Sequence, residues 1–207
     1  HGAVQHNWKT RTDIPEQINI LELQALGNLA YLRLSGCDLQ DVIFTPYFPK
    51  LRILDLRHCR FSPENLSSAP QLGKLTISYV DDSIMPYLRK LDKLRTLCLT
   101  KCSITDYSML SELPNLHNLA ISDPVGNVNL SSLQALPHLH TLSLGNLPSD
   151  PDFSALKHLC ELKSLSIDTP YFTKAQAEEL QAILPDCDIN TNTYHSPKKE
   201  NVSDNDI

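Results

Sequence analysis

Seven leucine-rich segments at almost equal spacing constrain the fold of this chain more than any other feature. The frame L-x-x-L-x-L-x-x-(N/C)-x-L is clearest at Leu29–Leu39, Leu51–Phe61 and Leu94–Ile104, and looser copies begin at Leu72, Leu116, Leu139 and Leu162. Successive copies begin 21 to 23 residues apart. Seven copies in register predict a solenoid in which each repeat forms one coil, because a single coil could not bury its own apolar side.

The second and third leucines of each frame lie two residues apart, which predicts a short strand with one buried face. Strands of successive coils should pair in parallel about 4.8 Å apart. The return segments are too short for long helices, so we expect 3₁₀ turns and single helical turns there. The predicted fold class is therefore α/β, with a parallel β-sheet on the concave face and short helical turns on the convex face. Apolar residues on the return path should pack under the sheet: Met109, Leu110, Leu113, Leu133, Leu136, Phe153, Leu156 and Leu159.

Over residues 26–189 the frame and its period resemble the leucine-rich-repeat family, and within it the subclass with repeats of 22 residues. A proline also recurs two residues before the first leucine, at Pro49, Pro70, Pro114 and Pro137. Proline is acceptable where a strand begins, since its missing N–H interrupts no ladder bond. The resemblance implies a solenoid that binds other proteins.

Both ends of a solenoid need covers. Residues 1–25 do not fit the frame and are expected to form an N-terminal cap, with Trp8 over the first coil and an apolar element containing Ile14, Ile18, Ile20, Leu21 and Leu23. At the other end, Thr173–Leu184 reads as a helix with a capping box formed by Thr173 and Gln176, an inner face of Leu180, Ile183 and Leu184, and a stop at Pro185.

Cys187 and Ile189 predict a last edge strand, which completes a solenoid of seven repeats and a terminal coil over residues 26–189. Residues 190–207 form a polar C-terminal tail without periodicity, which alone should be disordered.

The six cysteines do not form a disulfide framework in the repeat register. Cys37, Cys59 and Cys102 occupy the frame position at which a side chain turns inward and bonds loop backbone. We expect small buried thiols, including Cys160 and Cys187, and a reducing compartment. Cys37 and Cys59 lie on adjacent coils, so a bridge between them stays open, and Cys98 should point outward.

Frame positions three, five, seven and eight should point outward and form the binding face. In the first four coils these positions hold two tyrosines, four cationic residues and one histidine against one aspartate, although the whole chain has net charge −6. Tyr and Arg are enriched at binding hot spots. The predicted partner-binding residues are Tyr31, Arg33, Asp55, Arg57, His58, Tyr79 and Lys101. The alternative is an ordinary solvated face, with binding through rims, loops or the convex side.

Other classes of function find little support in the sequence. The net charge of −6 argues against a nucleic-acid binder, and no apolar run is long enough to insert into a membrane. The chain also lacks the basic start and following apolar stretch that would indicate a signal peptide.

Phosphate-loop and serine-hydrolase motifs are absent. His138 and His140 could share one side of an extended segment, but no third metal ligand is apparent. Cys187 and Asp188 resemble the Cys-x-Asp nucleophile of bacterial leucine-rich-repeat ubiquitin ligases, but the spacer and that family's catalytic domain are missing.

We therefore expect a protein-binding module that is not an enzyme, has no cofactor or metal, is monomeric and is cytoplasmic. Two alternatives stay open. One is the substrate-recognition domain of a larger enzyme, such as a ubiquitin ligase or a kinase. The other is a bacterial effector that acts in the host cytosol.

Overall fold

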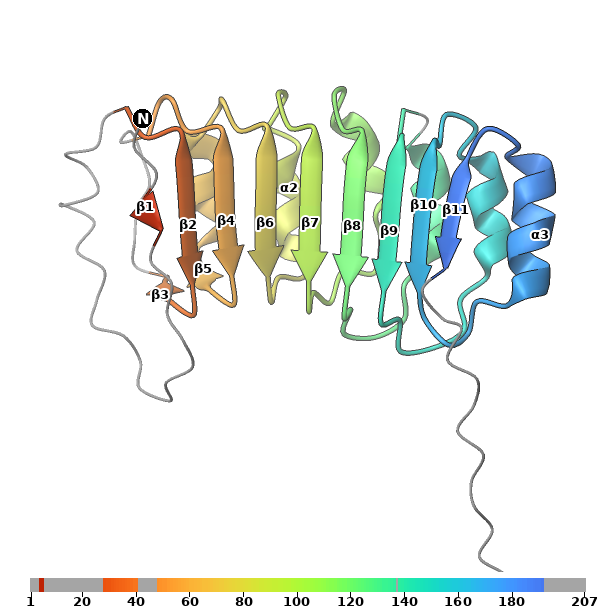
Figure 1. The fold of residues 1–207 in the computed structure, drawn as a ribbon. Coiled ribbons are helices and arrows are strands. Elements are labelled where there is room, and N and C mark those ends of the chain that lie inside the picture. The colour runs from red at the N-terminus through yellow and green to blue at the C-terminus, as the bar shows by residue number, and fades with distance from the viewer. Residues whose placement is uncertain (1–3, 6–27, 41–47, 137, 192–207) are drawn as a thin grey trace, which may run out of the picture.

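One parallel sheet runs the length of the protein (Figure 1). The computed structural model describes residues 4–5, 28–40, 48–136 and 138–191. Within them the sheet has nine strands in the order β1-β2-β4-β6-β7-β8-β9-β10-β11. Their bounds are β1 Val4–Gln5, β2 Tyr31–Ser35, β4 Ile53–Arg57, β6 Lys74–Ser78, β7 Thr96–Thr100, β8 Asn118–Ser122, β9 Thr141–Gly145, β10 Ser164–Asp168 and β11 Asp188–Thr191.

The strands pair at equal frame positions, so the repeat register of the sequence is also the register of the sheet. Tyr31 pairs with Ile53, and Lys74 pairs with Thr96. The backbone ladder extends one step before each strand. The carbonyl of His117, the residue after a first leucine, accepts the N–H groups of both His140 and Thr141 on the next coil, at 2.8 and 2.9 Å. This pattern repeats from coil to coil and holds the strand starts rigidly.

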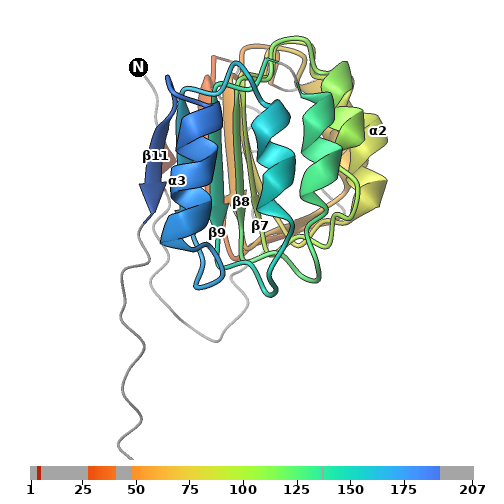
Figure 2. The ribbon, with the colours of Figure 1, turned by 90° about the vertical axis from the view of Figure 1, so that its right-hand side faces the viewer.

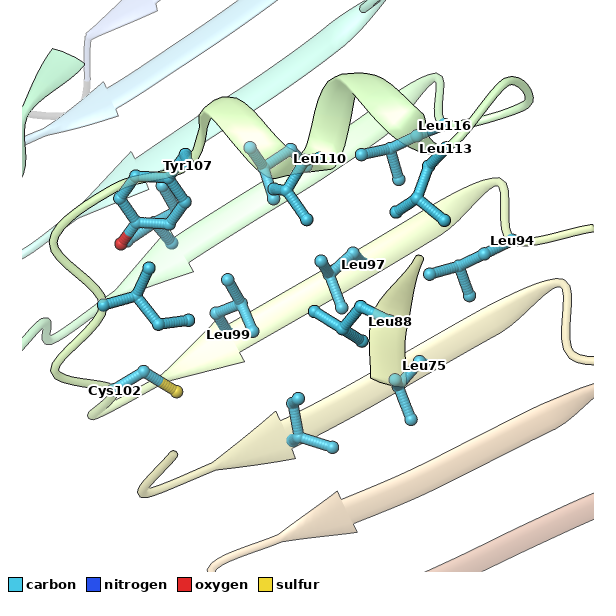
Figure 3. Close-up of a cluster of buried hydrophobic side chains, with 14 of the residues drawn as sticks. Leu75, Leu88, Leu94, Leu97, Leu99, Cys102, Tyr107, Leu110, Leu113 and Leu116 are labelled. Atoms are coloured by element: carbon cyan, nitrogen blue, oxygen red, sulfur yellow. The ribbon is translucent and has the colours of Figure 1, made fainter. Parts of the chain in front are cut away.

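Leucines and isoleucines at frame positions four and six make the core. All fourteen are at most 1% exposed: Leu32, Leu34, Leu54, Leu56, Leu75, Ile77, Leu97, Leu99, Leu119, Ile121, Leu142, Leu144, Leu165 and Ile167. Figure 3 shows Leu97 and Leu99 of β7 facing Leu88 and Leu110 of the return segments. Burying a leucine contributes roughly 1.5–3 kcal/mol, so the frame that predicts the fold also supplies most of its stability.

Short helical turns form the second layer and cover one face of the sheet (Figure 2). They are η1 Pro63–Ser68, η2 Asp82–Ile84, α2 Met85–Leu88, η3 Ser108–Glu112, η4 Leu130–Ala135 and η5 Phe153–His158. The predicted apolar residues of the return path are buried here, except that Met109 is only partly buried. A second, two-stranded sheet pairs β3 Asp38–Leu39 with β5 Arg60–Phe61. The predicted α/β leucine-rich-repeat solenoid is therefore confirmed.

Helix α3, Lys174–Ile183, follows the last repeat. The predicted capping box is present: the Gln176 N–H donates to Thr173 Oγ1 at 3.3 Å, and the Thr173 N–H donates to Gln176 Oε1 at 2.8 Å. Leu180 and Leu184 are buried as predicted, but the assignment of Ile183 to the inner face is wrong, because its side chain is 46% exposed. Ile183 lies three residues from Leu180, about 60° short of a full turn, on the flank of the helix.

The C-terminal edge of the sheet has the strand predicted from Cys187 and Ile189. Strand β11 pairs with β10, and Cys187 just before it is buried. At the other edge, Val4–Gln5 pairs with β2. The other residues of the predicted N-terminal cap, Trp8 included, and the tail from residue 192 lie outside the described residues. No described helix has the length and apolarity that a membrane crossing requires.

Candidate protein-binding surface

The face of the sheet turned away from the helical turns, here called the open face, carries the predicted binding residues. It corresponds to the concave face of the sequence prediction. Frame positions three, five and seven alternate with the buried leucines along every strand, so most of their side chains are half-buried or exposed. The structure brings the seven predicted residues together over β2, β4, β6 and β7 and the turns that follow these strands.

Asp55 lies at the centre of this group and holds two arginines. Arg33 Nε donates to Asp55 Oδ2 at 2.8 Å, and Arg57 Nε lies 3.2 Å from Asp55 Oδ1. The Asp55 side chain is only 4% exposed, whereas those of Arg33 and Arg57 are 43% and 57% exposed. The Arg57 contact is an ion pair only, since Asp55 Oδ1 lacks a hydrogen bond. One buried carboxylate therefore orients two exposed guanidinium groups, and this triad has one net positive charge.

Tyr31 extends the triad along β2. The Arg33 guanidinium carbon lies 5.6 Å from the centroid of the Tyr31 ring, a distance that suits a cation–π contact. Arg33 is thus held by Asp55 on the neighbouring strand and by an aromatic face on its own strand. A side chain fixed in this way loses little conformational entropy when it binds a partner.

His58, Tyr79 and Lys101 lie at frame position eight, directly after their strands. All three have left-handed backbone, with φ of 56°, 59° and 54°. The Tyr79 N–H donates to the Thr100 carbonyl at 3.2 Å, and the Lys101 N–H donates to the Ser122 carbonyl at 2.9 Å. The left-handed residue thus turns the chain away from the strand while its amide extends the ladder. The side chains of this position are presented at the end of the open face.

His58 and Tyr79, which lie on adjacent coils, also contact each other. Their ring centroids are 5.8 Å apart, and His58 Nδ1 lies 3.1 Å from the Tyr79 hydroxyl oxygen. Tyr79 is nevertheless 54% exposed, one of the few large apolar side chains in the described residues with that much exposure. The pair forms an aromatic ridge next to the charged triad.

Four residues predicted to point outward are buried: Asp55, Thr76, Ser78 and Thr169. The arginine pair covers Asp55. Thr76 and Ser78 are small side chains on the strand between β4 and β7, and Ser78 Oγ has no hydrogen-bond partner. Thr169 does not take the left-handed conformation of position eight, and its Oγ1 accepts from the Tyr171 N–H at 3.5 Å, so it turns into its loop. The frame gives the direction of a side chain but not what covers it.

The cysteines follow the register with one exception. The thiols of Cys37, Cys59 and Cys102 donate to the carbonyls of Ser35, Arg57 and Thr100, at 3.4, 3.5 and 3.4 Å, as predicted for the inward loop position. All six cysteines are free thiols. A hydrogen bond with Cys37, reinforced by burial, raises the pKa of Cys59. The prediction that Cys160 is buried is wrong: it is exposed, because it lies in the turn before the frame and not in it.

Two of the histidines considered for a metal site have structural partners. His138 Nδ1 lies 3.2 Å from Glu161 Oε2, and His140 Nδ1 bonds the His138 carbonyl at 2.7 Å. The His140 ring instead stacks on His117 of the preceding coil, with centroids 4.8 Å apart. No group of three metal-ligating side chains occurs in the part of the chain that the structure describes.

Sequence reasoning missed the left-handed turn at position eight, although a signal was present. Gly36, Asp123 and Asn146 occupy that position in three other coils, and Gly, Asn and Asp are the residue types that favour left-handed backbone. It also missed the Arg33–Asp55 pair. Both residues are at frame position five of adjacent coils, so the register alone places them side by side.

The comparisons with known proteins agree with this geometry. The family model described as Leucine Rich Repeat matches residues 50–72. No curated protein sequence matches the chain. Among solved structures, the fold is similar to an internalin of Listeria monocytogenes (TM-score 0.58, 22% identity, 82% of this chain and 51% of that one).

Two further structures are similar. One is a leucine-rich-repeat protein of Leptospira interrogans (TM-score 0.58, 19% identity, 82% and 50% covered). The other is internalin C2 of Listeria monocytogenes (TM-score 0.58, 23% identity, 82% and 74% covered). The chain spans about half the length of the first two proteins. The repeat frame, the family-model match over residues 50–72 and these likenesses show that the chain has a leucine-rich-repeat solenoid fold.

Proposed function

We propose that this protein binds a protein partner through the open face of its first four coils, and that an acidic group of the partner docks on Arg33 and Arg57. Leucine-rich-repeat solenoids are in general protein–protein interaction modules. Fold alone does not give the partner or the surface, so the argument depends on the side chains of the open face.

The observation that carries the proposal is the Arg33–Asp55–Arg57 triad. Asp55 contacts only the Nε atoms, at 2.8 and 3.2 Å. In the described part of the chain, the terminal nitrogens of both guanidinium groups have no hydrogen-bond acceptor. Two oriented guanidinium groups whose terminal N–H groups lack an acceptor among the described residues match the oxygens of a carboxylate or phosphate. A buried carboxylate that holds exposed arginines in place is an arrangement suited to anion binding.

The aromatic residues around the triad supply the apolar part of a binding surface. Tyr31 lies against Arg33, and Tyr79 presents a half-exposed ring next to His58. Tyr and Arg dominate binding hot spots because each combines a large contact area with polar groups. Lys101 adds a further cation beside Tyr79 on the adjacent coil.

A second candidate is a substrate-recognition domain within a larger enzyme. The same open face would then select the substrate. We further propose a reducing, cytoplasmic location and a monomeric state, the former supported by the free thiols of the adjacent Cys37 and Cys59.

The test is capture of partners from a lysate, with a variant that removes the charges of the triad without leaving a buried charge unpaired. The variant Arg33→Gln, Asp55→Asn, Arg57→Gln lowers the net charge by one. Arg60→Gln lowers it equally at an exposed site and is the matched control.

The proposal expects a protein that is captured by the wild type and by Arg60→Gln but lost with the triad variant. A second pair, Tyr79→Ala against Tyr171→Ala, should show the same contrast. Equal capture by all variants would refute the open face as the binding surface while leaving a binding function in place.

A further inference from the structure

The edge of the sheet at which the strands begin is uppermost in Figure 1. Basic residues gather along this edge. We define this start edge as the two residues before and the first two residues of each frame, in coils two to seven. In its described residues the start edge holds five Lys or Arg and two carboxylates. The basic residues are Lys50, Arg52, Lys93, Arg95 and Lys163. They lie away from the triad, which sits farther along the strands.

The backbone beneath these side chains is fixed. The Arg52 carbonyl accepts the N–H groups of Gly73 and Lys74 at 2.8 and 3.0 Å, and the Arg95 carbonyl accepts that of His117 at 3.1 Å. The residues at frame position two therefore stand in one column at the coil spacing of about 4.8 Å: Arg52, Gly73, Arg95, His117, His140 and Lys163. Arg52 and Lys163 are five coils apart, so the column is about 24 Å long.

On the opposite, strand-end side, six acidic residues accept hydrogen bonds that shape the loops: Asp38, Asp81, Asp82, Asp106, Asp123 and Asp152. Asp82, for example, accepts from the N–H and the hydroxyl of Thr105 at 2.9 and 2.7 Å. Six of the 24 acidic residues of the chain thus have a structural role in the loops.

Two of the five cations of the start edge also have structural partners, since Lys50 Nζ donates to Asn28 Oδ1 at 2.6 Å and Lys93 Nζ donates to Gln71 Oε1 at 2.9 Å. The other three do not. Arg52, Arg95 and Lys163 are exposed, and none of them forms an ion pair or a side-chain hydrogen bond with a described residue. Glu161, one of the two carboxylates on this edge, lies 3.2 Å from His138. Three cations without a partner among the described residues, on a backbone fixed by the ladder, raise the local concentration of anions next to them.

We infer that the start edge is a second docking surface, separate from the open face, and that its occupant is an extended acidic segment of a protein. An extended chain advances about 3.3 Å per residue, so about seven or eight residues span the 24 Å column. A nucleic acid is a poorer occupant, because the strand-end side and the net charge of −6 repel a long polyanion.

Fluorescence anisotropy with a labelled twelve-residue Glu/Ser peptide at low salt tests this inference. Arg52→Glu with Arg95→Glu should weaken binding at least about tenfold. The control Arg60→Glu with Lys174→Glu changes the net charge equally at exposed sites and should weaken binding less than about threefold. A four-residue peptide should bind at least about tenfold more weakly than the twelve-residue peptide, because it cannot span the column. If the Glu variant does not fold, Arg52→Gln with Arg95→Gln takes its place.

Four results would overturn the inference, the first three of which leave the proposed function untouched. The first is no binding by the wild type, and the second is equal weakening by the start-edge and control variants. The third is tighter binding of single-stranded DNA or of anionic phosphatidylserine vesicles than of the peptide. Loss of peptide binding in the triad variant alone would also contradict it, yet would support the proposed function, so the two can fail independently.

Discussion

Because the Asp55 carboxylate is buried, removing its charge and removing the charges of Arg33 and Arg57 should lower the free energy of unfolding by very different amounts. Asp55→Asn keeps the shape and leaves two arginines whose side chains are 43% and 57% exposed. They can turn to water, so the free energy of unfolding should fall by less than about 1 kcal/mol. Arg33→Met with Arg57→Met keeps the apolar stems over Asp55 but leaves a carboxylate of 4% exposure without a counter-charge. That loss should lower the free energy of unfolding by about 3 kcal/mol.

Urea unfolding at neutral pH, followed by circular dichroism, measures this asymmetry. With an m-value near 2–3 kcal/mol/M, the double Met variant should lower the midpoint by about 1–1.5 M, and Asp55→Asn by less than about 0.5 M. The triple variant Arg33→Met, Asp55→Asn, Arg57→Met should recover most of the stability that the double Met variant loses, because no buried charge is then unpaired. A double Met variant as stable as wild type would refute the reasoning, since it would mean that water reaches Asp55.

Three further predictions concern stability. Tyr107→Phe should not destabilise the protein and should add up to about 1 kcal/mol by urea unfolding, because the fully buried Tyr107 hydroxyl has no hydrogen-bond partner (Figure 3); a loss above about 1 kcal/mol would indicate a buried water there. Lys101→Val should lower the free energy of unfolding by more than about 1 kcal/mol while Lys101→Gly leaves it unchanged, because φ at this position is 54°. Equal effects of the two substitutions would contradict the left-handed turn. Hydrogen bonds from the serine two residues later lower the pKa of Asp81, Asp106 and Asp152. Their contribution to the stability of the fold is therefore present above the unfolded pKa of about 3.9 and is lost as pH falls through the lower folded pKa values. A thermal midpoint unchanged between pH 5 and pH 2.5 would contradict this prediction.

The periodic part of the fold could be predicted from the sequence because one physical requirement repeats in every coil. Leu97 and Leu142 are buried for the same reason, and the frame identifies both. The inward thiols and the capping box of α3 follow from equally local rules. These features depend on neighbours at a fixed distance along the chain.

The predictions that were wrong concern side-chain burial, which depends on the residues that pack over a side chain. The frame places Asp55 and Thr76 on the outward face, but it does not show that arginines cover Asp55 or that Thr76 lies below its neighbours. Ile183 and Cys160 lie outside the strict frame, where small rotations decide burial. The seven candidate binding residues could be brought to one face from the register. Their contacts, such as His58 with Tyr79, needed side-chain positions.

Radical footprinting of the complex with the captured partner shows directly which face is covered, since the reactivity of Tyr and His side chains depends on their exposure. We expect Tyr31, His58 and Tyr79 to lose reactivity when the partner binds, whereas Tyr171 and Ile183, 38% and 46% exposed near the last coil, keep theirs. Protection of Tyr171 and Ile183 with an unchanged Tyr79, which is 54% exposed in the free protein, would contradict binding on the open face of the first four coils.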